Sequence, residues 1–181
     1  MSLPNHLGGH CNRTHTDDAT LDFLIAKYNV KTMHDIGCGP GGMVELALTR
    51  GVDATGIDGD FTIKYREGFP SILHDFTTGP LSVRPADLGW SVEFLEHVEE
   101  KYMDNYFPVF AQCRVVCCTF ATNDKGHHHV NVKDQEYWDR QFTNRGFIKD
   151  EVSTAWIRKH SSMQREFIRN TGTVYSNTRV I

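Results

Sequence analysis

The chain has 181 residues, of which 39% are hydrophobic and 23% are charged, so it can bury a sizeable core and has an ordinary globular composition. Its formal net charge of −4 argues against a nucleic-acid partner, which usually needs a basic surface. No apolar run approaches the ~20 residues of a membrane span, and no secretory leader is recognisable. The cysteines are odd in number and form no CxxC pair, which favours a reducing compartment. We expect one cytoplasmic domain over residues 1–181 without a membrane contact; the sequence indicates no oligomeric state.

The first third of the chain alternates short apolar strands with amphipathic helices. Residues 1–16 have no periodicity and predict an irregular arm. A helix capped by Thr16 or Asp17 follows. Strands are predicted over 32–36 and 52–58, on either side of a helix that ends at Gly51. This order predicts a parallel sheet with helices on its faces.

The alternation continues through the rest of the chain. Strands are predicted over 71–76, 86–92 and 114–120, and the segment 95–112 is predicted to be helical with a break or kink at Pro108. Asn131 is predicted to cap a further helix, with Asp134 at its third position, that ends at Gly146. A sixth strand begins at 147–148, and a seventh spans 167–175.

A glycine-rich segment, Asp35 to Gly42 (Asp-Ile-Gly-Cys-Gly-Pro-Gly-Gly), joins the first strand to the second helix. Glycines are needed where a ligand must approach the backbone more closely than a Cβ allows. The pattern G-x-G-x-x-G formed by Gly37, Gly39 and Gly42 also fits a dinucleotide, and a tight turn without a ligand would use the same residues. The segment alone leaves these alternatives open.

Three carboxylates indicate an adenosine-containing cofactor, and together they favour S-adenosylmethionine (SAM) over NAD, although one of them does not discriminate. Asp35 suits the cationic methionine end of SAM, whereas dehydrogenases usually have an apolar residue there. Asp58 ends the following strand and can accept hydrogen bonds from ribose hydroxyls, as it would in either cofactor. Asp75, followed by Phe76, can accept from an adenine amine while the ring packs on the base; the alternative is an ordinary turn residue.

Segments 35–42, 56–60 and 87–98 resemble the corresponding motifs of class I SAM-dependent methyltransferases. The stretch Leu95-Glu96-His97-Val98 is similar to one in the small-molecule branch of that superfamily, and the match runs from about residue 30 to 120. The resemblance implies an α/β, Rossmann-like fold: a seven-stranded, mostly parallel sheet in the order 3-2-1-4-5-7-6, with strand 7 antiparallel and helices on both faces. It also implies that Ser91 and Val92 lie beside the adenosine. Because Trp90-Ser91 replaces the Asn/Asp-Pro-Pro-aromatic signature, amine methylation of DNA is not expected.

The predicted site combines these segments. The expected cofactor-binding residues are Asp35, Gly37, Cys38, Gly39, Pro40, Gly41, Asp58, Gly59, Asp75, Phe76, Ser91 and Val92. The candidate bases are His97, after the fourth strand, and His128, in the run 127–129 after the fifth; the alternatives are an exposed helix-start residue and a solvated polar loop. No metal is expected, because three consecutive histidines cannot easily turn to one ion and no carboxylate or cysteine partner is evident.

The arm over residues 1–16 can fold over the cofactor as a lid, with Arg13 and Thr14 facing the methionine carboxylate, or it can be a free tail. We expect a SAM-dependent methyltransferase that acts on a small-molecule acceptor, at oxygen. The alternatives are an NAD(P)-binding oxidoreductase, for which no Tyr-x-x-x-Lys dyad is found, and a SAM-binding protein without catalysis. The sequence does not identify the acceptor.

Overall fold

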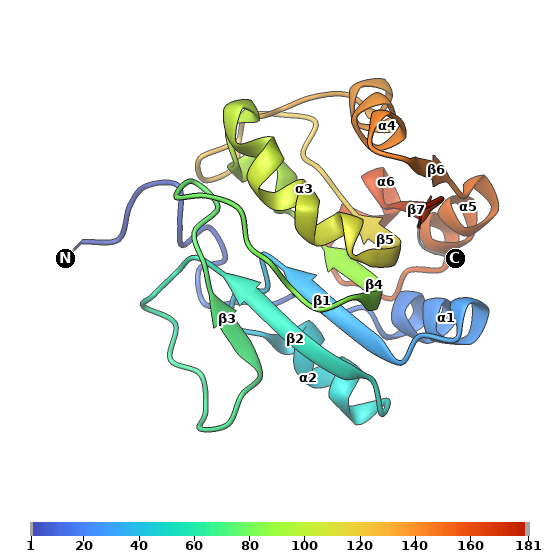
Figure 1. Cartoon of the computed structure of the whole chain (residues 1–181), viewed down its shortest axis with the longest axis horizontal. Coiled ribbons are helices and arrows are strands. Elements are labelled where there is room, and N and C mark those ends of the chain that lie inside the picture. The colour runs from blue at the N-terminus through green and yellow to red at the C-terminus, as the bar shows by residue number, and fades with distance from the viewer. Residues whose placement is uncertain (1, 180–181) are drawn as a thin grey trace.

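A seven-stranded sheet in the order β3-β2-β1-β4-β5-β7-β6 forms the centre of the computed structural model, which describes residues 2–179 (Figure 1). Neighbouring strands are parallel except for β7, which is antiparallel to both β5 and β6. This confirms the expected strand order. The strands are β1 (Thr32–Ile36), β2 (Asp53–Asp58), β3 (Ser71–Leu73), β4 (Ala86–Ser91), β5 (Cys113–Cys118), β6 (Phe147–Lys149) and β7 (Thr173–Asn177).

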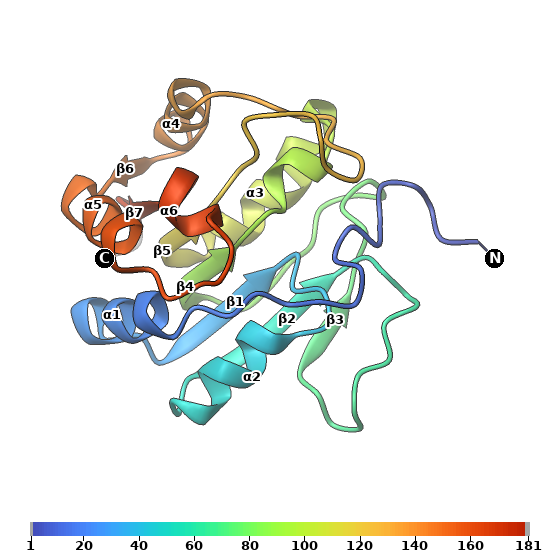
Figure 2. The same ribbon diagram turned by 180° about the vertical axis from the view of Figure 1, so that it is seen from behind.

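Helices cover both faces of this sheet, as Figures 1 and 2 show from opposite sides. They are α1 (Asp18–Tyr28), α2 (Gly42–Thr49), α3 (Met103–Ala111), α4 (Gln135–Asn144), α5 (Glu151–His160) and α6 (Phe167–Thr171), with 3-10 turns η1 (Leu95–His97) and η2 (Glu100–Tyr102). One hydrophobic core joins α3 and α4 to the sheet, and a second joins α1, α2, α5 and α6 to it. None of the helices within residues 2–179 is long and apolar enough to cross a bilayer.

Two predicted helix boundaries are confirmed by their capping geometry. Asp17, fully buried, accepts a hydrogen bond from the Thr20 backbone N–H at 2.9 Å and thereby begins α1. The second boundary is the end of α2, where Gly51 follows the helix with a left-handed φ of +74°. Local sequence signals are therefore sufficient to define the β1–α2–β2 unit that carries the glycine-rich turn.

The segment 95–112 is not the single helix that was predicted. It forms η1, η2 and then α3, which continues through Pro108 without a break. The backbone donor that Pro108 lacks would have bonded to the carbonyl of Asp104; both residues lie on the exposed side of α3, where water can satisfy that carbonyl. Asn131 does not cap α4 either, because the Asp134 side chain accepts from the Tyr137 N–H at 2.8 Å and takes that role.

The strand predicted over 167–175 is also wrong in its first half. Residues Phe167–Thr171 form α6, Gly172 follows it, and only Thr173–Asn177 form β7. A short apolar run does not distinguish a buried helical turn from a buried strand, which explains this error. The third predicted strand is shorter than expected and ends at Leu73, which places Asp75 in a turn after β3.

Candidate active site

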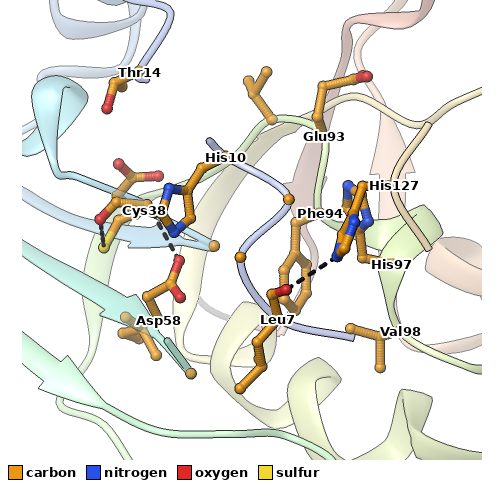
Figure 3. A pocket seen from close by; sticks show the side chains of 18 of the residues that line it. Leu7, His10, Thr14, Cys38, Asp58, Glu93, Phe94, His97, Val98 and His127 are labelled. Carbon is orange, nitrogen blue, oxygen red and sulfur yellow. Dashed lines mark hydrogen bonds between the residues drawn. The ribbon is translucent and has the colours of Figure 1, made fainter. Parts of the chain in front are cut away.

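A cavity of about 460 Å³ lies at the carboxyl edge of the sheet (Figure 3). Its wall is built from residues that follow β1, β2, β3, β4 and β5, and the N-terminal arm crosses it. In open α/β sheets this edge is where ligands bind, beside the point at which the strand order reverses. In this sheet the strand order reverses at β1, which has β2 on one side and β4 on the other. The candidate site lies beside this reversal.

The glycine-rich turn between β1 and α2 forms the floor of this cavity. Gly37 has a φ of +77°, and a Cβ there would lie 2.7 Å from the Phe94 ring, so no larger residue fits without a shift. A Cβ on Gly39, whose φ is +49°, would lie 3.0 Å from the Cβ of His10 in the arm. Because these two glycines have no Cβ, Phe94 and His10 can approach the backbone of the turn closely.

Two carboxylates flank this turn. Asp58 accepts hydrogen bonds from the backbone N–H groups of Gly39 and Asp60, both at 2.8 Å and each through a different oxygen. Asp35 is 3% exposed and faces the cavity, and burial together with the charge of Asp58 raises its pKa to about 8. A cationic ligand in the cavity would stabilise the ionised form of Asp35, so this wall is electrostatically suited to a positive charge.

Asp75 lines the cavity from the turn after β3. It accepts from His6 Nε2 at 2.9 Å and from both the N–H and the hydroxyl of Thr77. Burial acts to raise its pKa, but these hydrogen bonds outweigh burial and hold the pKa below its usual value. Phe76, next to it, lines the cavity and packs edge-to-face on Phe94.

Most of the predicted cofactor-binding residues lie together on the cavity wall. Those that line it are Asp35, Gly37, Cys38, Gly39, Asp58, Gly59, Asp75, Phe76 and Val92. Three others lie outside the wall. Ser91 is fully buried and donates its hydroxyl to the Ile36 carbonyl at 3.0 Å, Gly41 packs against Phe69, and Pro40 lies between Gly39 and Gly41 in the turn. Their roles stay predictions.

The N-terminal arm lies across the cavity and contributes to its wall (Figure 3). In addition to the contact between His6 and Asp75, His10 Nε2 bonds Asp60 at 3.0 Å and the Leu7 carbonyl bonds His127 Nε2 at 3.0 Å. The Gly42 N–H, at the start of α2, donates to Thr14 Oγ1 at 3.2 Å. Arg13 and Thr14 both line the cavity. The role of the arm as a lid stays a prediction.

The two histidines predicted as bases occupy different places. His97 lines the cavity, and burial, reinforced by the nearby His129, lowers its pKa to about 4, so its ring is neutral at pH 7. His128 is not part of the wall; its ring lies 6.2 Å from that of His6, and its φ is +49°. Of the histidine run after β5, His127 and His129 face the cavity instead.

Several residues of the site were not predicted. Arg165 and Phe167, from the segment before and within α6, line the cavity, as does His15. Glu93 also lines it, and its φ of +55° is unusual for a residue other than glycine. A signal for Glu93 and Glu96 was present in the spacing Glu-x-x-Glu-His, which brings two carboxyls and an imidazole close together in the chain.

Comparison with solved structures identifies this architecture. The methyltransferase domain of bacterial CtHen1-CN aligns with a TM-score of 0.58 and 13% identity, over 88% of this chain and 96% of that one. Magnesium protoporphyrin IX methyltransferase from Synechocystis PCC 6803, with bound SAM, aligns at 0.59 and 15% over 88% and 77%. The chain has the class I methyltransferase fold. The plantazolicin methyltransferase BpumL, in complex with a triazolic desmethylPZN analogue and SAH (S-adenosylhomocysteine), aligns with a TM-score of 0.57 and 12% identity over 88% of this chain and 83% of that one.

The sequence itself gives no such match. No family model matches it, and no curated protein matches it either. The position of β7, antiparallel between β5 and β6, distinguishes this class I methyltransferase fold from the classic dinucleotide-binding order 3-2-1-4-5-6. The oxidoreductase alternative is therefore not favoured.

Proposed function

We propose that this chain is a SAM-dependent methyltransferase that transfers a methyl group to a small-molecule acceptor, at oxygen. The observation that carries the proposal is the arrangement of Asp35 and Asp58 on either side of a glycine turn, in a cavity at the carboxyl edge of the sheet. Structures of the same fold, two of them crystallised with SAM or SAH, support it.

The residues of the cavity fit the parts of SAM. Each Asp58 oxygen uses one lone pair on a backbone N–H, which leaves a further lone pair for a ribose hydroxyl. Asp35 would offset the positive charge of the methionine end, while Arg13 and Thr14 would face its carboxylate. Phe76 and Val92 offer an apolar surface for the adenine.

When bound, SAM supplies a methyl group on a positively charged sulfur, which keeps the electron pair of the broken S–C bond and leaves as the thioether of SAH. The chain then has mainly to hold two reactants in line and to exclude water. The docked arm performs the second task. A hydroxyl acceptor must also lose its proton, and the neutral ring of His97 faces the cavity where that proton would be released.

A small acceptor suits the size and surroundings of the site. The cavity adjoins a second hollow of about 590 Å³, and both are lined by Glu93, His129 and Arg165. We infer that SAM occupies the part near the glycine turn and that the acceptor enters from this second hollow. The net charge of −4 does not favour a nucleic acid here.

Calorimetric titration of the purified chain with SAM, SAH and NAD tests the proposal directly. We expect SAM and SAH to bind with 1:1 stoichiometry and NAD not to bind. Binding of NAD without binding of SAM would overturn it. Transfer of a labelled methyl group to hydroxyl compounds then tests catalysis; SAM binding without transfer over a broad acceptor panel would instead support a non-catalytic SAM-binding protein.

A further inference from the structure

The carboxylate of Glu96 is fully buried beside the cavity, in η1. Neither of its oxygens meets hydrogen-bond geometry with any group within residues 2–179, although the carboxyl of Glu93 and the backbone of Ala121 face it. A buried carboxylate without partners is costly, so such a group is normally paired, protonated or bound to a metal. Glu96 is therefore either protonated or held by a partner that the neighbouring side chains do not supply.

Two imidazoles converge on the same place. Glu96, His97 and His129 each bring one ligating atom to within 4.8 Å of the others. The loop carrying His129 is fixed to η1, because the backbone N–H groups of Val130 and Asn131 donate to the Glu96 carbonyl at 2.9 and 3.0 Å. His129 Nδ1 lies 2.8 Å from the Asn123 carbonyl, which must accept its proton and so leaves Nε2 as the free lone pair.

We propose that Glu96, His97 and His129 bind a divalent transition-metal ion at the wall of the cavity. Two imidazole nitrogens and one carboxylate oxygen form a donor set that Zn²⁺ and other first-row divalent ions prefer, with further coordination positions left open. The sequence had argued against a metal, because three consecutive histidines cannot easily turn to one ion and no carboxylate partner was evident. Neither reason applies to this arrangement. Only one histidine of the run 127–129 takes part, and the carboxylate comes from Glu96 on another segment.

The surroundings reinforce this assignment. Glu93 adds a second carboxylate next to Glu96, in a left-handed backbone conformation that Thr119 supports by donating to Glu93 Oε1 at 2.9 Å and accepting from the Glu93 N–H at 2.8 Å. Strained backbone that is held in this way often marks a ligand site. The carboxyls of Glu93 and Glu96 lie side by side, and because two negative charges repel each other, a cation next to them would stabilise their ionised forms.

The location also gives the ion a role, and this part rests on the proposed function. His97 lines the cavity proposed for SAM, while His129 and Glu93 line both that cavity and the adjoining hollow. An ion held here would lie at the junction, where the open coordination positions suit an oxygen of the acceptor. Divalent ions lower the pKa of a hydroxyl that they bind, so activation by the ion would take the place of proton acceptance by the His97 ring, whose lone pair is then on the ion. The acceptor class is then a hydroxyl compound able to ligate a metal.

The test is metal binding by the whole chain, independent of activity. After treatment with EDTA, the protein is titrated with Zn²⁺, Mn²⁺ and Co²⁺ by calorimetry, and Co²⁺ binding is also followed by its visible absorption. We expect one ion per chain. Glu96→Gln and His129→Ala should weaken binding by about 100-fold or more, since even the loss of a residue behind a ligand costs 10- to 100-fold.

Matched controls come from the same segments. Glu99→Gln, which changes an exposed residue near η1, and His128→Ala, next to His129, should leave metal affinity unchanged. Bound Zn²⁺ should raise the Tm of the wild type but not that of Glu96→Gln. The metal-free form of this variant should be at least as stable as the wild type, because an amide of nearly the same shape replaces a buried carboxyl that has no hydrogen-bond partner. A merely structural Glu96 would instead make Glu96→Gln less stable.

Two results would overturn the metal site: no 1:1 binding of any of the three ions, or binding that Glu96→Gln and His129→Ala leave unaltered. SAM affinity separates this proposal from the proposed function. If Glu96→Gln loses the metal and keeps SAM, the ion site stands on its own evidence. If the wild type binds metal but not SAM, the cofactor proposal fails and the metal site does not.

Discussion

Binding of SAM should release a proton from Asp35. With a pKa of about 8 in the buried site, about 0.9 of the Asp35 side chains carry a proton at pH 7 by mass action. A cation placed beside this carboxyl favours its ionised form, so the pKa falls on binding and up to about 0.9 proton leaves per SAM bound. Near pH 9.5 the group is already ionised and the release should disappear.

The assay is calorimetry in pairs of buffers of different ionisation enthalpy, such as phosphate and Tris at pH 7 and borate and glycine at pH 9.5, because the observed enthalpy then varies with the number of protons released. Asp35→Asn is the matched control, and it also corrects for the amino group of SAM, which titrates in the same range. The wild type should differ from Asp35→Asn at pH 7 and agree with it at pH 9.5. Equal proton release by both proteins at pH 7 would refute the assigned contact between Asp35 and a cationic ligand.

Three further predictions concern the same framework. Asp58→Ala should weaken SAM binding by about 100-fold or more in calorimetry, because two hydrogen bonds to a charged group, each worth about 1.5–3 kcal/mol, are lost; unchanged affinity would exclude the placement. Gly37→Ala should lower the free energy of unfolding, measured in urea, by more than Gly51→Ala does. Both have a left-handed φ, which costs a larger residue about 1–2 kcal/mol, but only Gly37 would also press on a neighbour. Asp150→Asn should lower the Tm at pH 7, since hydrogen bonds from Ser153, Tyr28 and Lys27 outweigh burial and hold the pKa of Asp150 well below its usual value. Because that pKa is depressed in the folded state, the difference in Tm should shrink as the pH falls below about 4.

The framework of the sheet was predictable because its signals are local. Asp17 caps α1, Gly51 ends α2, and the turn from Asp35 to Gly42 needs its glycines whatever surrounds it. Periodicity places β1, β2 and β4 correctly to within a residue. The strand order, in contrast, came from the resemblance, because pairing between distant strands leaves no trace in a single short segment.

The errors arise where tertiary contacts decide. Pro108 is accommodated inside α3 because its position is exposed, which a helix pattern does not reveal. Phe167 and Ile168 could equally have begun a strand, and only packing of α6 against α5 selects the helix. Glu96 was visible in the sequence, but its burial without a partner is a property of the fold, so the convergence with His129 could not have been read from spacing.

The docked arm has a kinetic consequence. Its contacts with Asp60 and Asp75 join it to the segments after β2 and β3, and the Leu7 carbonyl joins it to the loop after β5. On the side that the arm covers, any molecule that fills the cavity near the glycine turn can exchange with solvent only when these contacts open. If SAM binds beneath the arm, opening of residues 6–14 would then limit how fast the spent cofactor leaves on this side, whatever the rate of the chemical step.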